Sequence, residues 1–195
     1  TRSKGIVLIP GTAKEIEGVQ VLLLNINEYP DIDNLKDLDK LPSKVLRIIP
    51  HPFYPIGHGG GFFLEENPHL FHALEYSSIY LSLVNKANKK AQRFAIRHNI
   101  PIVGNSDCHL LSQFGSTYTL VDSKKNKDSI VRASKNNKIL MNTRPMKVGV
   151  LLAFLTRSFI STFIETLSGG NSSESRDTDY PEEDYVDLKS VRNNK

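Results

Sequence analysis

The sequence of 195 residues contains a single cysteine, Cys108, and no apolar run of the roughly 18 residues that a membrane span requires. One cysteine excludes an intramolecular disulfide framework and a zinc site built from cysteines alone. It also fits a reducing compartment, so we predict a cytoplasmic protein without a membrane span. The chain begins Thr-Arg-Ser-Lys and runs directly into an apolar segment, which predicts no signal peptide. Its only methionines are Met141 and Met146, so we expect that the true beginning of the protein precedes Thr1.

Charge is unevenly distributed along the chain. The net charge is +4, from 25 basic and 21 acidic residues. Residues 168–195 hold seven acidic and four basic residues, so residues 1–167 carry +7. A basic body suits a phosphate-bearing ligand, but its lysines are scattered, which favours an ordinary solvated surface over a nucleic-acid stripe. Nucleic acid is therefore a partner that no motif supports.

Apolar runs bounded by turn residues alternate with segments of helical periodicity. The predicted strands are residues 5–10, 20–26, 45–50, 73–77, 100–104, 118–122 and 139–142. The predicted helices are residues 33–41, 85–98 and 128–134. This alternation, with strands that are apolar throughout, indicates an α/β fold whose parallel strands are buried on both faces.

The C-terminal part differs from the body in composition. Apolar residues between 148 and 167 recur at helical spacing, which predicts an amphipathic helix over 147–167 that packs against the body. Residues 168–195 are rich in Ser, Gly, Asn, Asp and Glu, and cannot bury enough apolar surface to offset their ordering entropy. We therefore predict a disordered acidic tail.

Three residues at predicted strand ends could converge on a metal ion. Asp107 and His109 flank Cys108, and in an extended segment positions i and i+2 point to the same side. His51 directly follows the strand at 45–50 and could add a third ligand. An oxygen and a nitrogen ligand together suit Zn, Mn or Fe better than Ca. Taken singly, however, Asp107 is better explained as a helix cap and His109 as a partly buried polar residue.

Several sequence blocks, in a fixed order, resemble the PHP (polymerase and histidinol phosphatase) family of metal-dependent phosphoesterases. The resemblance covers about residues 1–146, which we predict to be one PHP-like domain. The blocks are Ile9-Pro10-Gly11, Val21-Leu22-Leu23, His51-Pro52-Phe53, Ala73-Leu74-Glu75-Tyr76-Ser77, Asn88-Lys89-Lys90-Ala91, Ile100-Pro101-Ile102-Val103-Gly104-Asn105-Ser106-Asp107-Cys108-His109 and Gln113-Phe114-Gly115-Ser116-Thr117-Tyr118-Thr119.

The resemblance implies a distorted, TIM-like (β/α)7 barrel with a cluster of metal ions at its C-terminal face. It also implies hydrolysis of phosphate esters by metal-activated water, with a phosphorylated small molecule or nucleotide as substrate. By resemblance, His51 matches the ligand of the His-Pro block, and Asp107 and His109 match the paired ligands of the Ser-Asp-x-His block. The expected cofactors are divalent ions (Zn, Mn or Fe).

The chain departs from the family pattern at its N-terminal side. Ala13 stands where the family has a bridging glutamate, and Glu15 would need a register shift to replace it. Gln20 stands where the family has a histidine, and the His-x-His and Thr-Asp-His blocks expected before Ile9 are absent. The barrel should therefore be incomplete. Three matched ligands are too few for a multinuclear centre, because each ion needs at least four donors.

The departures leave three hypotheses open. The first is an impaired phosphoesterase, with metal ions reduced in number or absent. The second is a non-catalytic module that binds phosphate or metal, a pseudoenzyme. The third is an interaction protein that works through the helix at 147–167 and the acidic tail.

Overall fold

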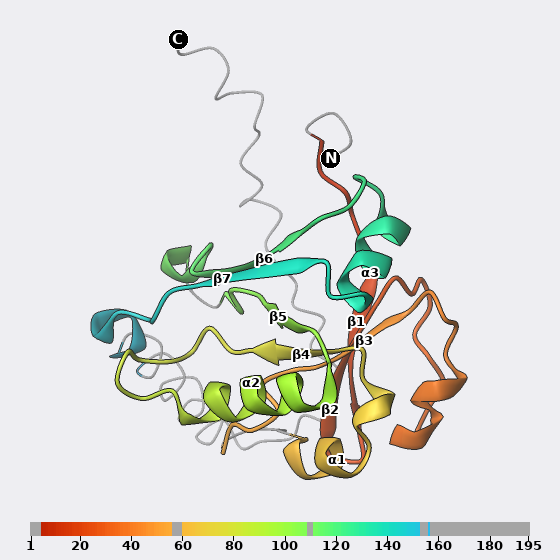
Figure 1. Ribbon diagram of the computed structural model, residues 1–195, viewed down its shortest axis with the longest axis horizontal. Helices are drawn as coiled ribbons and strands as arrows, with labels where there is room; N and C mark the ends of the chain where they lie inside the picture. The colour runs from red at the N-terminus through yellow and green to blue at the C-terminus, as the bar shows by residue number, and fades with distance from the viewer. Residues whose placement is uncertain (1–4, 56–59, 109–110, 153–155, 157–195) are drawn as a thin grey trace, which may run out of the picture. The chain divides into compact units, whose positions relative to one another are not determined.

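The computed structural model describes residues 5–55, 60–108, 111–152 and 156. The chain divides into two units, Thr1–Thr156 and Arg157–Lys195, and every described residue belongs to the first. The strands are β1 (Gly11–Ile16), β2 (Val19–Leu24), β3 (Leu46–Ile49), β4 (Ala73–Tyr76), β5 (Ile102–Gly104), β6 (Thr117–Val121) and β7 (Ile139–Thr143). The helices are η2 (Leu35–Lys40), α1 (Gly61–Glu66), η3 (Pro68–Leu70), α2 (Lys86–His98), η4 (Leu111–Gln113) and α3 (Lys127–Lys135) (Figure 1).

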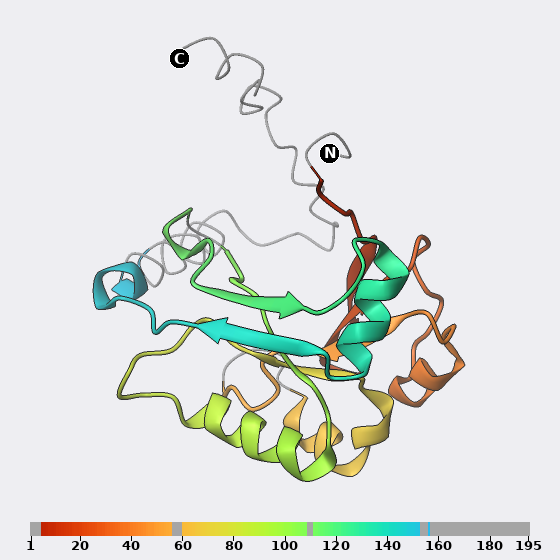
Figure 2. The same cartoon turned by 45° about the horizontal axis from the view of Figure 1, so that its top comes forward.

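The strands form two sheets. The larger one has five strands in the order β1-β2-β3-β4-β5, and β6 pairs with β7 in a separate antiparallel sheet. In the larger sheet β3, β4 and β5 are parallel, whereas β2 runs antiparallel to both β1 and β3. Figure 2 shows β6 and β7 apart from the larger sheet.

The predicted (β/α)7 TIM-like barrel is wrong for the described residues, whose strands form two open sheets and no closed barrel. A hairpin is one reason. Glu17 and Gly18 have φ values of 51° and 76°, and a two-residue turn with positive φ at both positions reverses the chain directly. β1 and β2 are therefore antiparallel neighbours, without the crossover helix that each barrel strand requires. The second reason is that the chain returns from β6 through α3 into an antiparallel β7.

Most predicted elements are present within a few residues of their expected positions, but the predicted strand at 5–10 is wrong. Residues 6–10 have no regular structure, and Ile6 and Leu8 are exposed. The strand begins instead at Gly11, because pairing with β2 starts there. The Pro10 carbonyl accepts hydrogen bonds from the backbone N–H groups of Asn25 (2.6 Å) and Ile26 (3.3 Å), which joins the two strand ends.

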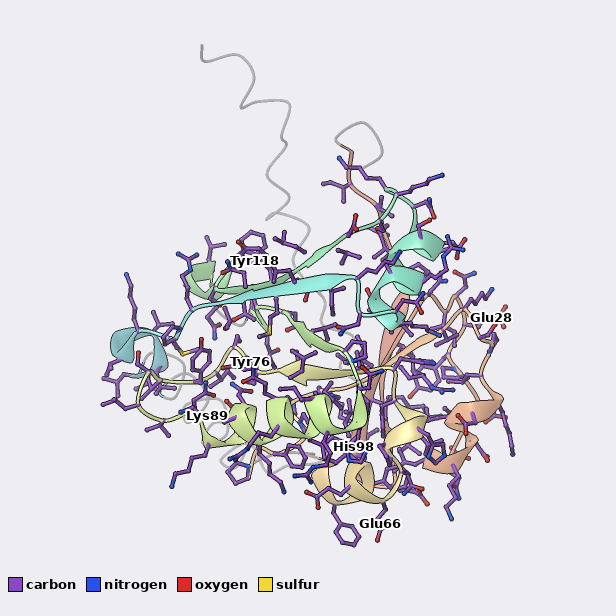
Figure 3. All side chains as sticks on the ribbon, in the orientation of Figure 1. Glu28, Glu66, Tyr76, Lys89, His98 and Tyr118 are labelled. Carbon is purple, nitrogen blue, oxygen red and sulfur yellow. The ribbon has the colours of Figure 1, made fainter. Side chains whose placement is uncertain are left out.

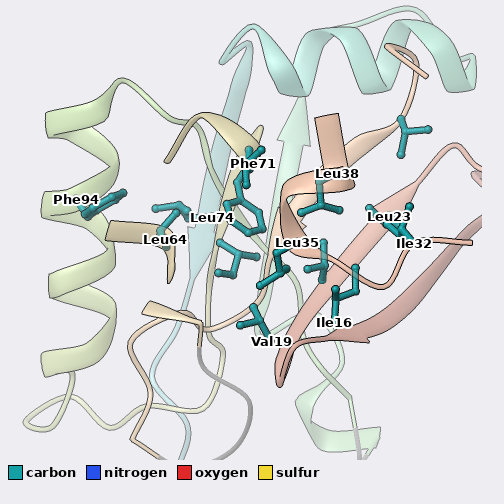
Figure 4. Close-up of a cluster of buried hydrophobic side chains, with 14 of the residues drawn as sticks. Ile16, Val19, Leu23, Ile32, Leu35, Leu38, Leu64, Phe71, Leu74 and Phe94 are labelled. Carbon is teal, nitrogen blue, oxygen red and sulfur yellow. The ribbon is translucent and has the colours of Figure 1, made fainter. Parts of the chain in front are cut away.

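Alternate residues of the larger sheet enter two separate cores, as the two-residue period of a strand requires. On one face, Val21, Leu23, Ile49 and Leu74 pack with Phe94 of α2 and with side chains of α1 and η2. Figure 4 shows this core, with Phe94 on the helix opposite Ile16 and Leu23 of the hairpin. On the other face, Leu46, Ile48 and Ala73 pack with Val131 of α3, and Leu22, Leu24 and Val103 lie against them. We call this second side the α3 face.

The β6–β7 sheet lies next to β5. The Thr119 hydroxyl donates to the Gly104 carbonyl (2.8 Å), and the Gly104 N–H donates to the same hydroxyl oxygen (2.8 Å). A Cβ at Gly104 would meet Thr117 Cγ2 at 2.6 Å and Met141 Cγ at 2.9 Å. Only glycine at position 104 therefore allows the β6–β7 sheet to pack this closely against β5.

The C-terminal predictions fall largely outside the described residues. Residues 148–152 and 156 are helical, and the remainder of the predicted helix over 147–167 and the whole predicted tail over 168–195 are not described. Among the described residues, no helix has the length and apolar character needed to cross a membrane.

Candidate functional site

The candidate site lies where the three parallel strands end. β3, β4 and β5 run in the same direction, so their carboxyl ends meet at one edge of the sheet. His51 follows β3, Glu75 is the third residue of β4, and Asn105 directly follows β5. Figure 3 labels Tyr76, the last residue of β4, at this edge. Ligands of α/β sheets bind beyond such strand ends.

Glu75 is the centre of this group. It is 4% exposed, its Oε2 accepts the backbone N–H of His51 at 3.2 Å, and its Oε1 accepts the amide of Asn105. Burial raises the pKa of Glu75 to about 7, and the negative charge of Asp107 acts in the same direction. The two hydrogen bonds oppose this rise but do not cancel it. A buried carboxylate with such a pKa can hold a proton near neutral pH or share its charge with a cation.

His51 contributes a buried ring nitrogen. Its Nδ1 is inaccessible to solvent and makes no hydrogen bond within the described part of the chain. The residue has a φ of 30°, a left-handed conformation that non-glycine residues adopt rarely and at some cost. Its ring lies edge-on to that of Tyr54, with 6.3 Å between the centroids. A buried nitrogen without a hydrogen bond is costly, and metal coordination is one way of satisfying it.

Asn105 links Glu75 to Asp107. While its amide donates to Glu75, its Oδ1 accepts the backbone N–H of Asp107 at 3.0 Å. Asp107 has a φ of 42°, so the chain turns sharply directly after β5. His51 and Asp107, two of the three predicted metal ligands, are therefore both placed around the same carboxylate.

The third predicted ligand, His109, lies outside the described residues, so its position relative to His51 and Asp107 remains a prediction. Within the described ranges, no three His, Cys, Asp or Glu side chains are grouped closely enough to hold a metal ion.

Serine hydroxyls join the loops that carry the site. Ser78, after β4, donates to the carbonyl of Ser106 at 2.8 Å. The Ser106 hydroxyl donates to the Thr117 carbonyl at 3.0 Å and accepts the Gly115 N–H at 2.9 Å. The loops after β4 and β5 are thus fixed to each other and to the start of β6.

The other described histidines lie away from this edge. His72 precedes β4, at the opposite end of the strand, and its Nδ1 accepts the backbone N–H of Arg47 at 3.1 Å. Burial and the charges of Arg47 and Lys135 lower the pKa of His72 to about 3, so this ring is neutral. His69 is exposed near Asp39, and His98 stacks on Phe94 at the end of α2. His58 lies outside the described residues.

The register of the sheet places Gln20 on the same face as Glu75. Glu75 is two residues from Ala73, and Gln20 is two residues from Leu22, so both lie on the α3 face. Leu22 pairs with Ile48. The pairing of β2 with β3 ends at this pair, and Gln20 lies two residues beyond it, on the side towards which β3 leads to His51.

Sequence reasoning named the block that contains Glu75 but assigned it no role, and it did not single out Asn105. One signal could have found Glu75. It is the only charged residue in a four-residue strand that is otherwise Ala, Leu and Tyr. A carboxylate buried within such a strand requires partners, and the strand ends on either side are where they would be found.

Comparisons with known proteins concern both family and fold. A family model described as PHP-associated matches residues 85–139, from the residue before α2 to the first residue of β7. No curated protein matches the chain. Among solved structures, the crystal structure of PsfC from Pseudomonas syringae PB-5123 is similar, with a TM-score of 0.54 and 15% identity. The alignment covers 79% of this chain and 66% of PsfC, so this chain spans slightly less than two thirds of that protein, and the likeness concerns the fold alone.

Proposed function

We propose that this chain, which the PHP-associated match supports as a PHP family protein, binds a divalent cation at the edge formed by β3, β4 and β5. We further propose that this site serves the hydrolysis of a phosphate ester. The observation that carries the proposal is Glu75, a buried carboxylate held between the backbone of His51 and the amide of Asn105.

The chemistry of the residues at this edge suits a divalent cation, but their side chains are not grouped closely enough in the described ranges to enclose one. The raised pKa of Glu75 means that its negative charge is poorly compensated by the protein, and a cation would compensate it. The buried Nδ1 of His51 offers a nitrogen donor, and Asp107 adds a second carboxylate. His51, Glu75 and Asp107 are not grouped closely enough in the structure to hold an ion as they stand, so the proposed ion would have to draw these side chains together, with His109 as the further ligand that the resemblance implies. Mixed oxygen and nitrogen donors suit Zn, Mn or Fe.

A bound divalent ion would lower the pKa of a water molecule and neutralise charge on the phosphate oxygens. The chain's own residues would orient these groups. Asn105 holds Glu75 and the backbone of Asp107 in a fixed relation, and the hydrogen bonds of Ser78 and Ser106 limit movement of the surrounding loops.

Two substitutions favour the alternative of a non-catalytic metal- or phosphate-binding module. Ala13 and Gln20 replace an expected carboxylate and an expected imidazole, and Gln20 lies on the α3 face next to the strand that leads to His51. A site with fewer donors can retain a cation without supporting hydrolysis.

Metal binding and hydrolysis can be measured separately on the full chain. We expect Mn²⁺ to bind in calorimetry and to activate hydrolysis of 4-nitrophenyl phosphate. Glu75→Gln should weaken both, whereas Glu66→Gln, which changes an exposed carboxylate on α1, should alter neither. Binding without hydrolysis would support the non-catalytic module, and the absence of Zn²⁺, Mn²⁺ and Fe²⁺ binding would refute the metal site.

A further inference from the structure

A cavity of about 390 Å³ opens beside the candidate site. Tyr54 and Tyr80 supply aromatic walls, and among the described residues its other polar side chains are Asn85 and Lys86. The remaining lining residues are apolar: Pro55, Ile79, Leu81, Val84, Ala87 and Leu151. The volume is in the range of small-molecule sites, which are characteristically apolar with a few polar groups.

The wall of the cavity is continuous with the candidate site. The backbone N–H of Tyr54 donates to the His51 carbonyl at 3.1 Å, and the rings of these two residues lie in a T-shaped arrangement with centroids 6.3 Å apart. On its other side, the Tyr54 hydroxyl donates to the carbonyl of Ile79, in the segment that follows β4. Tyr54 therefore contacts His51 and also forms part of the cavity wall.

The aromatic walls are held in place by their neighbours. The Tyr80 ring packs against that of Tyr76 in a T-shaped arrangement, with centroids 5.5 Å apart, and its hydroxyl is 3.0 Å from the Thr143 hydroxyl. Asn85 donates from Nδ2 to the Tyr76 hydroxyl at 2.6 Å. Its Oδ1 is buried and accepts no hydrogen bond within the described residues. The Tyr80 ring is thus held in place on the cavity wall.

We propose that this cavity binds the apolar, aromatic part of the ester whose phosphate lies at Glu75, an inference that rests on the proposed function. A flat ring can contact Tyr54 and Tyr80 and bury its surface against the aliphatic side chains. A sugar- or glycerol-like group would instead leave its hydroxyls without partners against an apolar wall, which is costly.

Benzyl phosphate and ethyl phosphate test the proposal, because both are esters of primary alcohols with similar leaving groups. With Mn²⁺, the kcat/KM of the full chain for benzyl phosphate should be roughly tenfold to hundredfold higher than its kcat/KM for ethyl phosphate. Ala87→Leu fills the cavity and should bring this ratio towards one. Gln92→Leu introduces the same side chain at an exposed position of α2 and should leave the ratio unchanged. Val84→Trp, which fills the cavity from an exposed rim position, serves if Ala87→Leu does not fold.

A binding measurement separates this inference from the proposed function. In EDTA, fluorescence of 8-anilinonaphthalene-1-sulfonate should report binding to the wild-type chain and to Gln92→Leu, but less to the filled variants. If this holds while neither ester is hydrolysed, the phosphoesterase function fails and the apolar cavity site stands. Equal hydrolysis of both esters overturns the inference. So does wild-type self-association that is lost in the filled variants, because it would identify the cavity as a contact between copies of the chain.

Discussion

Glu75 makes the stability of the metal-free protein depend on pH. Burial, followed by the charge of Asp107, raises its pKa from 4.5 to about 7 in the folded chain. Because each pKa unit corresponds to about 1.4 kcal/mol, the folded state loses roughly 3 kcal/mol relative to the unfolded chain once Glu75 is ionised. The sign follows from proton binding. Between these two pKa values the folded chain binds more protons than the unfolded one, so stability falls as pH rises through this window and is lowest above pH 7.

Glu75→Gln should remove this dependence, since a neutral amide replaces the titrating group. We expect the free energy of unfolding by urea in EDTA to fall between pH 5 and pH 8 by roughly 2–3 kcal/mol more in the wild type than in Glu75→Gln. His72 acts in the opposite direction, because its lowered pKa makes the folded state gain stability as pH rises from about 3 to 6.5. Both proteins contain His72, so the difference between them isolates Glu75.

The exposed variant Glu66→Gln should follow the wild type at both pH values. Adding Mn²⁺ at pH 8 should recover stability in the wild type and less in Glu75→Gln, because a ligand that binds only the folded state stabilises it. The reasoning about Glu75 is refuted if the wild type and Glu75→Gln lose the same free energy between pH 5 and pH 8 in EDTA.

Three further substitutions test the site and the packing around it. Gln20→His should raise Mn²⁺ affinity in calorimetry by roughly tenfold, the effect of one additional contact of about 1.4 kcal/mol, and unchanged affinity would exclude position 20 from the site. Asn105→Ala removes a hydrogen bond that lowers the pKa of Glu75, so the pH at which stability declines should move upward, and an unmoved midpoint would contradict that role. Gly104→Ala should cost roughly 1–3 kcal/mol in urea unfolding because its Cβ would meet side chains of the β6–β7 sheet at 2.6 and 2.9 Å. Gly149→Ala, which meets nothing within 4 Å, is the control, and equal effects would argue against the tight packing.

Local patterns predicted the elements of this chain well. The predicted helix over 85–98 is confirmed as α2, because Ala91, Phe94 and Ala95 all face the core. The apolar runs at 45–50 and 73–77 are confirmed as β3 and β4, two fully buried strands. These predictions succeeded because the hydrophobic period is a property of each segment alone.

The arrangement of the strands in space was harder to predict from the sequence than the strands themselves. The barrel was an expectation from family resemblance, whereas the hairpin at Glu17-Gly18, where both residues have positive φ, was not predicted from the sequence. The family itself is supported by the PHP-associated match, although that match covers only residues 85–139. A resemblance in sequence blocks therefore indicated the family without fixing how the described strands are connected in space.

The candidate site depends on contacts between distant residues. His51, Glu75 and Asn105 are each separated by more than twenty positions, and no spacing rule connects them. They meet because three parallel strands end at one edge. The prediction that His51 and Asp107 lie near each other rested on that general property of α/β sheets, and the role of Glu75 required knowing which face of β4 it occupies.

The pairing of β1 with β2 also decides which side chain can take the place of the glutamate that the resemblance expects at position 13. Ala13 and Glu15 are two residues apart on β1, so both lie on the same face of the sheet as Glu75. Glu15 pairs with Gln20 and is therefore nearer the edge where His51 follows β3. A carboxylate thus remains on this face without any shift in strand register. Because the α3 face retains carboxylates and lacks the imidazole that the resemblance expects at position 20, we expect the proposed cation site to be short of nitrogen donors rather than of oxygen donors, and Gln20→His tests this expectation directly.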